Sequence, residues 1–138
     1  MSERLTRPEV REGAFLILYQ MMFGQTLEEI EELNSQAFDM AKNGQTDEIV
    51  NGVVEHDEEL CGIISKYSRT RAISRIAKVN LVILKIALFE MKYAERVPPA
   101  VAINEAVELA KKYSQKSDSG FINGILNSYL RELNGNDK

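Results

Sequence analysis

The sequence contains no tryptophan, one cysteine (Cys61) and one histidine (His56). A single cysteine cannot form an intramolecular disulfide, and one cysteine with one histidine supplies too few nitrogen and sulfur ligands for a zinc site. His56 lies inside the acidic run Glu55 to Glu59, which is typical of an exposed helix face. We therefore expect no metal and no cofactor, and we expect Cys61 to be a small buried hydrophobic residue.

Long apolar runs are also missing. No stretch approaches the roughly 20 apolar residues that a transmembrane helix requires. The first residues, MSERLTRPEVRE, contain no apolar signal segment. The eight glycines are scattered and form neither G-x-G-x-x-G nor a Walker loop, and no catalytic constellation stands out. The expectation is a cytoplasmic protein that is not an enzyme and has no membrane partner.

Negative charge dominates only the first half of the chain. Residues 1–66 contain five Lys or Arg and fourteen Asp or Glu, a net of -9, whereas residues 67–138 contain twelve and seven, a net of +5. No acidic residue lies between Leu60 and Phe89, and the cations of that stretch are Lys66, Arg69, Arg71, Arg75, Lys78 and Lys85. A local basic run inside an acidic protein indicates an anionic partner.

Hydrophobic periodicity predicts helices throughout and no strand. With 138 residues, 44% of them hydrophobic, the chain is long enough for one domain with a core. Capping boxes at Thr6 and Thr26 predict helices to about Phe23, before Gly24, and to Asn43. Thr46 is expected to cap a long third helix that reaches Tyr67. A short helical turn between Ser68 and Ile76 and an apolar helix over 79–93 should follow.

The stretch from Val97 to Leu126 predicts two further helices that pack together. Pro98 and Pro99 suit a helix start, and Ser117 or Ser119 is expected to cap the second helix. Each helix has an apolar face, with apolar residues spaced three and four positions apart. The face of the first helix comprises Ile103, Ala106, Val107 and Ala110, and that of the second comprises Ile122, Ile125, Leu126, Tyr129, Leu130 and Leu133. The prediction is an all-α bundle of about seven helices in two subdomains. The first subdomain comprises residues 1–43 with part of the third helix, and the second comprises the rest of the chain.

Basic and aromatic residues form the only constellation that carries chemistry. Arg4, Arg7 and Arg11 lead the chain, and Arg75, Lys78 and Lys85 belong to the basic run. Tyr19, Tyr67 and Phe121 offer aromatic faces on which unstacked bases could lie. The same residues can also be explained structurally, as helix-end cations, lysine and arginine stems on apolar surface, and core aromatics.

The sequence also resembles a known family. INEAVELAKKY followed by FINGIL is similar to the signature of the bacterial transcription antitermination factor NusB family, although the same residues also suit an ordinary helical hairpin. REGAFLILYQ resembles the first helix of that family, and IISKY with ISRIAKVNLVILKIALFEMKY resembles its middle. The resemblance covers nearly the whole chain and implies one all-helical RNA-binding domain over residues 1–138.

The resemblance implies a function as well. The family has no enzyme activity, and its members pair with the ribosomal protein that doubles as NusE. Together they bind the boxA element of nascent RNA, which keeps RNA polymerase transcribing past terminators, notably in ribosomal RNA operons. The arginine-rich first segment of the family maps to Arg4, Arg7 and Arg11, which the resemblance implies are RNA-binding, and its RNA-contacting aromatics map to Tyr19, Tyr67 and Phe121.

The chain departs from the family pattern at several positions. Its first basic segment has only three arginines, interspersed with glutamates; Lys85 stands where many members have arginine, and Gly120 where lysine is common. Arg71 stands near a common tryptophan. Two alternatives stay open: a protein-interaction module, such as a homodimer, that does not bind RNA, and a regulatory RNA-binding domain like the segment fused to some ribosomal RNA methyltransferases.

Overall fold

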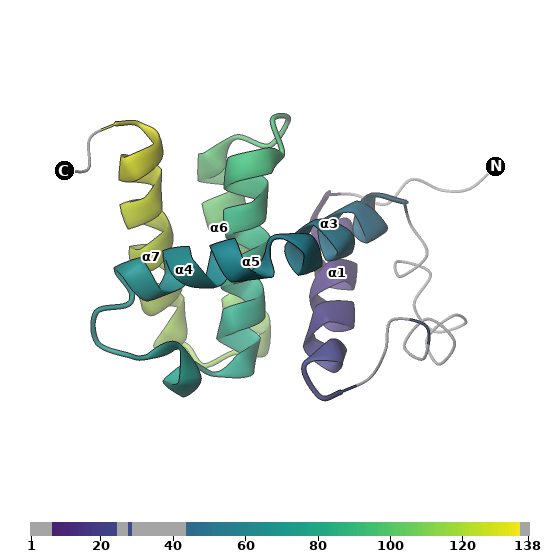
Figure 1. Ribbon diagram of the computed structural model, residues 1–138, viewed down its shortest axis with the longest axis horizontal. Helices are drawn as coiled ribbons and strands as arrows, with labels where there is room; N and C mark the ends of the chain where they lie inside the picture. The colour runs from purple at the N-terminus through teal and green to yellow at the C-terminus, as the bar shows by residue number, and fades with distance from the viewer. Residues whose placement is uncertain (1–6, 25–27, 29–43, 136–138) are drawn as a thin grey trace. The chain divides into compact units, whose positions relative to one another are not determined.

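The computed structural model describes residues 7–24, 28 and 44–135, and within these ranges it contains six α-helices, one 3₁₀-helix and no strand (Figure 1). The predicted all-α fold class is confirmed, with a helix number close to the predicted seven. The predicted cap at Thr6 and the predicted helix that ends at Asn43 lie outside the described residues. The chain divides into two compact units, Met1–Glu55 and His56–Lys138.

Two helices of the first unit are described, α1 (Arg7–Met21) and α3 (Gly44–Glu55), and they pack against each other. Both helices bury apolar residues, which are Val10, Ala14, Ile17 and Leu18 in α1 and Ile49, Val50 and Val53 in α3. Helix α1 ends two residues before the predicted end. Gly24 follows with φ of +90°, a conformation that glycine adopts at low cost, and its N–H donates to the Met21 carbonyl at 3.1 Å.

A break at His56 divides the predicted third helix, so the prediction of one continuous helix is wrong. Helix α3 begins at Gly44, which places Thr46 in the first turn and not at the cap. Helix α4 (Asp57–Tyr67) starts afresh after His56, whose φ is −102° and ψ is 16°. Three acidic residues, 57–59, open α4, and carboxylates stabilise a helix amino terminus. That acidic triplet is the sequence signal for the break.

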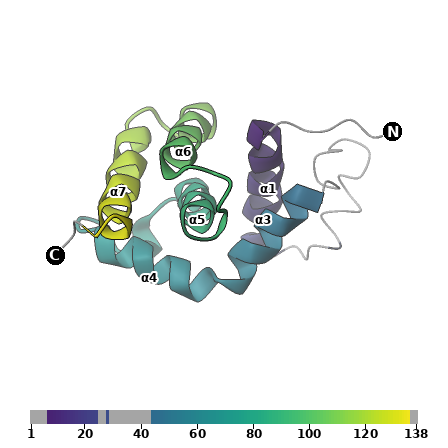
Figure 2. The same cartoon turned by 90° about the horizontal axis from the view of Figure 1, so that it is seen from above.

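The second unit is built around α5 (Lys78–Tyr93). Every residue from Asn80 to Met91 except Lys85 is buried, as expected for a helix that is apolar nearly all round. Figure 2 shows α5 surrounded by α4, α6 (Pro99–Tyr113) and α7 (Asp118–Leu133), and α5 packs against all three. The predicted turn before α5 is the 3₁₀-helix η2 (Ile73–Arg75).

The two carboxy-terminal helices follow the prediction apart from their caps. Pro99 opens α6, and the carbonyl of Pro98 accepts the first helical bond from the N–H of Ala102 at 3.1 Å. Ser117 precedes α7 but its side chain makes no capping bond, and the hydroxyl of Ser119 donates to the Lys116 carbonyl instead. The apolar faces of the two helices pack on each other and on α5.

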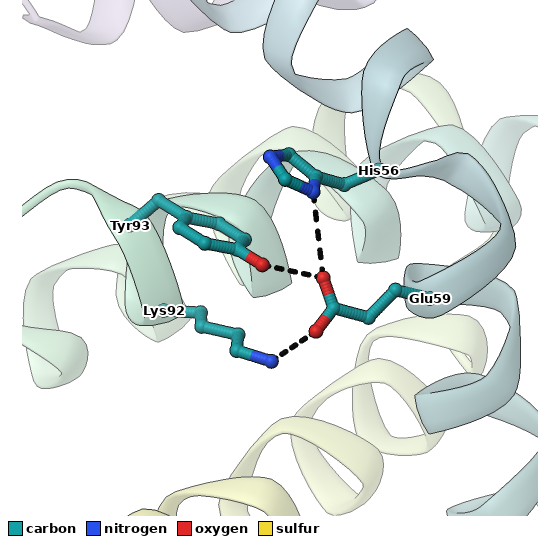
Figure 3. Close-up of polar contacts among 4 residues, drawn as sticks. All are labelled: His56, Glu59, Lys92 and Tyr93. Atoms are coloured by element: carbon teal, nitrogen blue, oxygen red, sulfur yellow. Dashed lines mark hydrogen bonds and ion pairs between the residues drawn. The ribbon is translucent and has the colours of Figure 1, made fainter.

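A polar cluster ties the start of α4 to the end of α5 (Figure 3). The Glu59 carboxylate accepts hydrogen bonds from the Lys92 ammonium and, at 2.5 Å, from the Tyr93 hydroxyl. The His56 ring stacks on Tyr93 with centroids 4.2 Å apart, and its Nδ1 lies 3.5 Å from Glu59 Oε1. The acidic run is therefore not simply a solvated face, because Glu59 is bound to α5.

Burial of α5 generates the first prediction. Replacing Leu88, which is completely buried, with alanine should reduce the free energy of unfolding by about 2–5 kcal/mol, since it removes apolar contacts and leaves a cavity. Urea denaturation followed by circular dichroism measures this loss. Val101→Ala, at an exposed position of α6, is the control and should change stability by no more than about 0.5 kcal/mol. Equal, small effects of both substitutions would contradict the central position of α5.

The Glu59 cluster generates a prediction about acid stability. The hydrogen bond from Lys92, followed by that from Tyr93, holds the pKa of Glu59 below its ordinary value of 4.5. A carboxylate with a lowered folded-state pKa stabilises the fold above its unfolded pKa, and this contribution disappears as the pH falls through the folded pKa. Glu59→Gln should therefore lose less stability than the wild type between about pH 5 and pH 3. Thermal unfolding across this range measures the difference.

Glu95→Gln is the matched control for that titration, because Glu95 is an exposed carboxylate in the loop between α5 and α6. Its pH profile should follow that of the wild type. If Glu59→Gln and the wild type lose stability in parallel as the pH falls, the cluster does not stabilise the contact between α4 and α5.

Candidate nucleic-acid interface

Half of the basic run of the sequence lies in the segment between α4 and α5. Arg69, Arg71 and Arg75 are exposed there. The segment is held in place from inside: the buried Ser68 hydroxyl donates to the Arg71 carbonyl at 2.7 Å, and Ile76 is buried. Two anchors on either side of an exposed arginine-rich stretch fix its backbone while its charged side chains face solvent.

Phe121, predicted to stack on a base, already has a cationic partner. The Arg71 guanidinium carbon lies 4.3 Å from the centre of the Phe121 ring, which is cation–π geometry. Arg71 Nη1 also lies 3.9 Å from Asp118 Oδ1, one turn earlier in α7. The aromatic face is therefore occupied by an arginine that is itself held loosely by a carboxylate.

Asp118 is part of a polar network at the start of α7. The Ser114 hydroxyl lies 2.8 Å from both Asp118 Oδ2 and Asn80 Oδ1, and its single proton can be donated to one of them at a time. The bond from Ser114 holds the pKa of Asp118 below its usual value, helped by Asn80, the Gln115 backbone and the Arg71 charge. Asp118 is consequently an anion at neutral pH and remains a partner for Arg71.

Tyr67 lies at the opposite end of α7 from Phe121. Its hydroxyl donates to Glu132, and the same carboxylate oxygen lies 2.7 Å from the Lys66 ammonium. Lys66 and Tyr67 hold the pKa of Glu132 below its ordinary value. Glu132 follows Phe121 by eleven residues, or about 16 Å along a helix axis, so the two aromatic rings do not form one continuous stacking platform.

The three remaining basic residues predicted in this unit differ in accessibility. Arg75 in η2 and Lys78 at the start of α5 are exposed. The Lys85 side chain is only 13% exposed, and its ammonium lies 2.7 Å from Asp57 Oδ1 of α4. Lys85 is thus a link between α4 and α5. Cys61 beside it is only partly buried, which corrects the prediction, and burial raises the pKa of its thiol.

The predicted residues of the first unit are all on α1 or before it. Arg4 lies outside the described residues, and Arg7 begins α1. Arg11 is only 2% exposed, and it takes part in interactions within the protein. The Tyr19 ring stacks on Phe15 at 5.8 Å between centroids and meets Phe23 edge to face at 5.1 Å. Arg11 and Tyr19 are therefore integrated in the packing of α1.

The structure draws attention to Arg69 and Arg71, which the sequence placed in the basic run but not among the RNA contacts. The uninterrupted run of cations was the available signal. Contact between Arg71 and Phe121, fifty positions later, was not foreseeable from spacing.

In the described ranges no group of three His, Cys, Asp or Glu side chains is arranged to hold a metal ion. None of the helices in that part of the chain has both the length and the apolar character to cross a membrane.

Comparison with known proteins places these features in a family. The NusB family model matches residues 8–131. The transcription antitermination protein NusB of Acetivibrio thermocellus is 40% identical over 88% of this chain and 86% of its own length. The corresponding protein of Enterococcus faecalis is 36% identical over 94% of this chain and 92% of its own.

Solved structures agree with the sequence relatives. NusB of T. maritima has a TM-score of 0.81 and 26% identity, and the match covers 94% of each chain. A chain from the crystal structure of the antitermination factors NusB and NusE in complex with dsRNA has a TM-score of 0.75 and 27% identity, covering 91% of this chain and 96% of that one. With the family model matched over most of its length, this chain belongs to the NusB family.

Proposed function

We propose that this protein is a transcription antitermination factor that binds boxA RNA together with NusE and supports processive transcription of ribosomal RNA operons. The observation that carries the proposal is the likeness to the NusB–NusE–RNA structure over nearly the entire length of both chains. The exposed cations between α4 and α5 support it, because phosphate contacts provide much of the affinity for nucleic acid.

The proposal includes the setting in which the protein acts. It works in the cytoplasm as part of an RNA polymerase antitermination complex, without catalytic activity and without a cofactor. Residues 1–138 act as a single all-helical RNA-binding domain. The antitermination role of the relatives supports the cellular setting. The polar loops and helix ends described above support a role in binding RNA and not in catalysing a reaction.

Residue roles can be proposed for the second unit. Arg75 and Lys78 contact RNA phosphates, since both are exposed and they lie three positions apart where η2 leads into α5. The rings of Tyr67 and Phe121 stack on separate bases, because the two rings lie against opposite ends of α7. Lys85 is a positioning residue, as its ammonium is paired with Asp57.

For the first unit we propose that Arg4 and Arg7 contact phosphate at the entrance to α1. Arg11 has a positioning role, because a direct phosphate contact would require its buried side chain to leave the packing of α1. Tyr19 keeps its proposed place in the interface because it is only partly buried.

NusE is expected to raise the RNA affinity of this protein. The net charge is -4. Two cations of the second unit, Lys66 and Lys85, are already paired with carboxylates. A basic partner would add phosphate contacts and hold the RNA in register. Titration of labelled boxA RNA with this protein, with NusE and with both measures the effect. The proposal fails if the mixture binds no more tightly than the better of the two single proteins.

Phe121 is expected to contribute base stacking. Phe121→Ala should weaken RNA binding by about 1–3 kcal/mol, roughly 5- to 150-fold, which is the usual contribution of one aromatic–base stack. Phe121→Tyr, which keeps an aromatic face, should bind nearly as tightly as the wild type. Filter binding or fluorescence anisotropy gives the affinities, and circular dichroism verifies the helical fold. Equal affinities of the alanine and tyrosine variants would show that Phe121 does not stack on a base.

A further inference from the structure

The segment after α4 encloses a pocket of about 400 Å³. Its lining comes from the last turns of α4 and from the first residues of the segment, namely Ser65, Ser68, Arg69, Thr70, Arg71, Ala72 and Ile73. Two arginines and three hydroxyl-bearing residues contribute to this lining, and no acidic residue does. The pocket is therefore positively charged, although the protein as a whole carries a net charge of -4.

This composition fits a phosphate group. Guanidinium groups bind phosphate oxygens through two parallel N–H donors, and hydroxyl groups donate to the remaining oxygens. The Ser68 hydroxyl holds the Arg71 carbonyl and so shapes the pocket, while Ser65 and Thr70 are further hydroxyl-bearing residues of the lining. No described residue forms an ion pair with Arg69, which leaves its charge available to a ligand.

Arg71 links this pocket to the Phe121 ring. Its side chain is 41% exposed, and its 3.9 Å approach to Asp118, which is 17% exposed, is long for an ion pair. The long separation makes this a weak ion pair, so a phosphate, which can accept two parallel N–H bonds from a guanidinium, can compete for the arginine. Asp118 keeps its bond from Ser114 when Arg71 leaves, so the carboxylate is not left without a partner.

We propose that this pocket binds a phosphate of the RNA backbone through Arg69 and Arg71, and that Arg71 moves from Asp118 and the Phe121 ring to that phosphate. The movement uncovers the aromatic face for the neighbouring base, so phosphate binding and base stacking occur together. This inference rests on the proposed RNA-binding function and adds a site and two residues to it.

The salt dependence of RNA binding tests the pocket. Each single-strand phosphate contact contributes roughly 0.7 to the slope of log affinity against log salt concentration. Arg69→Ala with Arg71→Ala removes both contacts to one phosphate and should therefore lower the slope by about 0.7, and Arg69→Ala alone should lower it by a smaller amount. The matched control is Arg96→Ala with Arg131→Ala, which removes the same charge from exposed positions outside the pocket and should leave the slope nearly unchanged.

The single variant Arg69→Ala keeps the test valid if the double variant does not fold. Arg69 is exposed, and its removal breaks no ion pair among the described residues. Circular dichroism compares the fold of all variants. If the folded pocket variants and the control have the wild-type slope while RNA binding persists, the pocket is not a phosphate site, and the proposed function stands without it.

A second measurement uses inorganic phosphate and NMR spectroscopy. Phosphate should shift the backbone amide signals of residues 69–71 in the wild type and not in the double variant. RNA should also remove the ring-current shift that Phe121 imposes on the Arg71 side-chain protons. Shifts with phosphate but an unchanged RNA salt slope would identify a site for free phosphate and overturn the RNA assignment.

Failure of the proposed function has a different signature. If the wild type binds no RNA with or without NusE, that function is wrong, and the phosphate titration alone decides the anion pocket. Absence of any phosphate-induced shift at residues 69–71 would then overturn the pocket as well.

Discussion

The second unit depends on the complete burial of α5. A helix that is apolar on almost every side cannot remain in water, so it requires three covering helices, which are α4, α6 and α7. Burying one large aliphatic side chain contributes about 1.5–3 kcal/mol, and α5 buries several. The covering helices leave their ends and connections at the surface, and these are the parts that carry the cations and Phe121.

Polar residues of α5 are accommodated where the helix meets its neighbours. Asn80 is buried in the first turn and lies beside the Ser114 hydroxyl, which also reaches Asp118 at the start of α7. The Asn80 Oδ1 has the Ser114 hydroxyl as its hydrogen-bond partner, and through Ser114 this network connects the start of α5 to the start of α7. Asp118 in turn engages Arg71, and the surface arrangement is thereby connected to the core.

Charge pairing changes how the basic run should be understood. Lys66 and Lys85 each lie 2.7 Å from a carboxylate, and Arg71 is near Asp118. The six lysines and arginines of the basic run therefore overstate the positive charge that the run offers to an anion. Three exposed arginines of the run, Arg69, Arg71 and Arg75, lie in the short segment between α4 and α5, which makes this segment the centre of the proposed interface.

Much of the fold was predictable because periodicity is a local property. The helices α5, α6 and α7 and the turn η2 follow directly from apolar spacing, two prolines and a short basic interruption. The break at His56 was missed because the apolar stripe continues through it. The His56 ring at this break stacks on Tyr93, and these two residues are far apart in the sequence.

The candidate site was predictable in composition but not in geometry. The basic run and the three aromatic residues are visible in the sequence, whereas their partners are set by tertiary packing. Tyr67 meets Glu132 across 65 positions, and Lys85 meets Asp57 across 28. The burial of Arg11 likewise depends on the tertiary packing around α1.

The most direct test of the account is the footprint of RNA on the backbone amides, measured by hydrogen exchange in the presence of NusE and of NusE with boxA RNA. The account predicts that adding RNA slows exchange in residues 65–78 and 117–124 and leaves the carboxy-terminal half of α6, residues 106–112, unchanged. Protection restricted to α6, with residues 65–78 exchanging at their original rate, would contradict it.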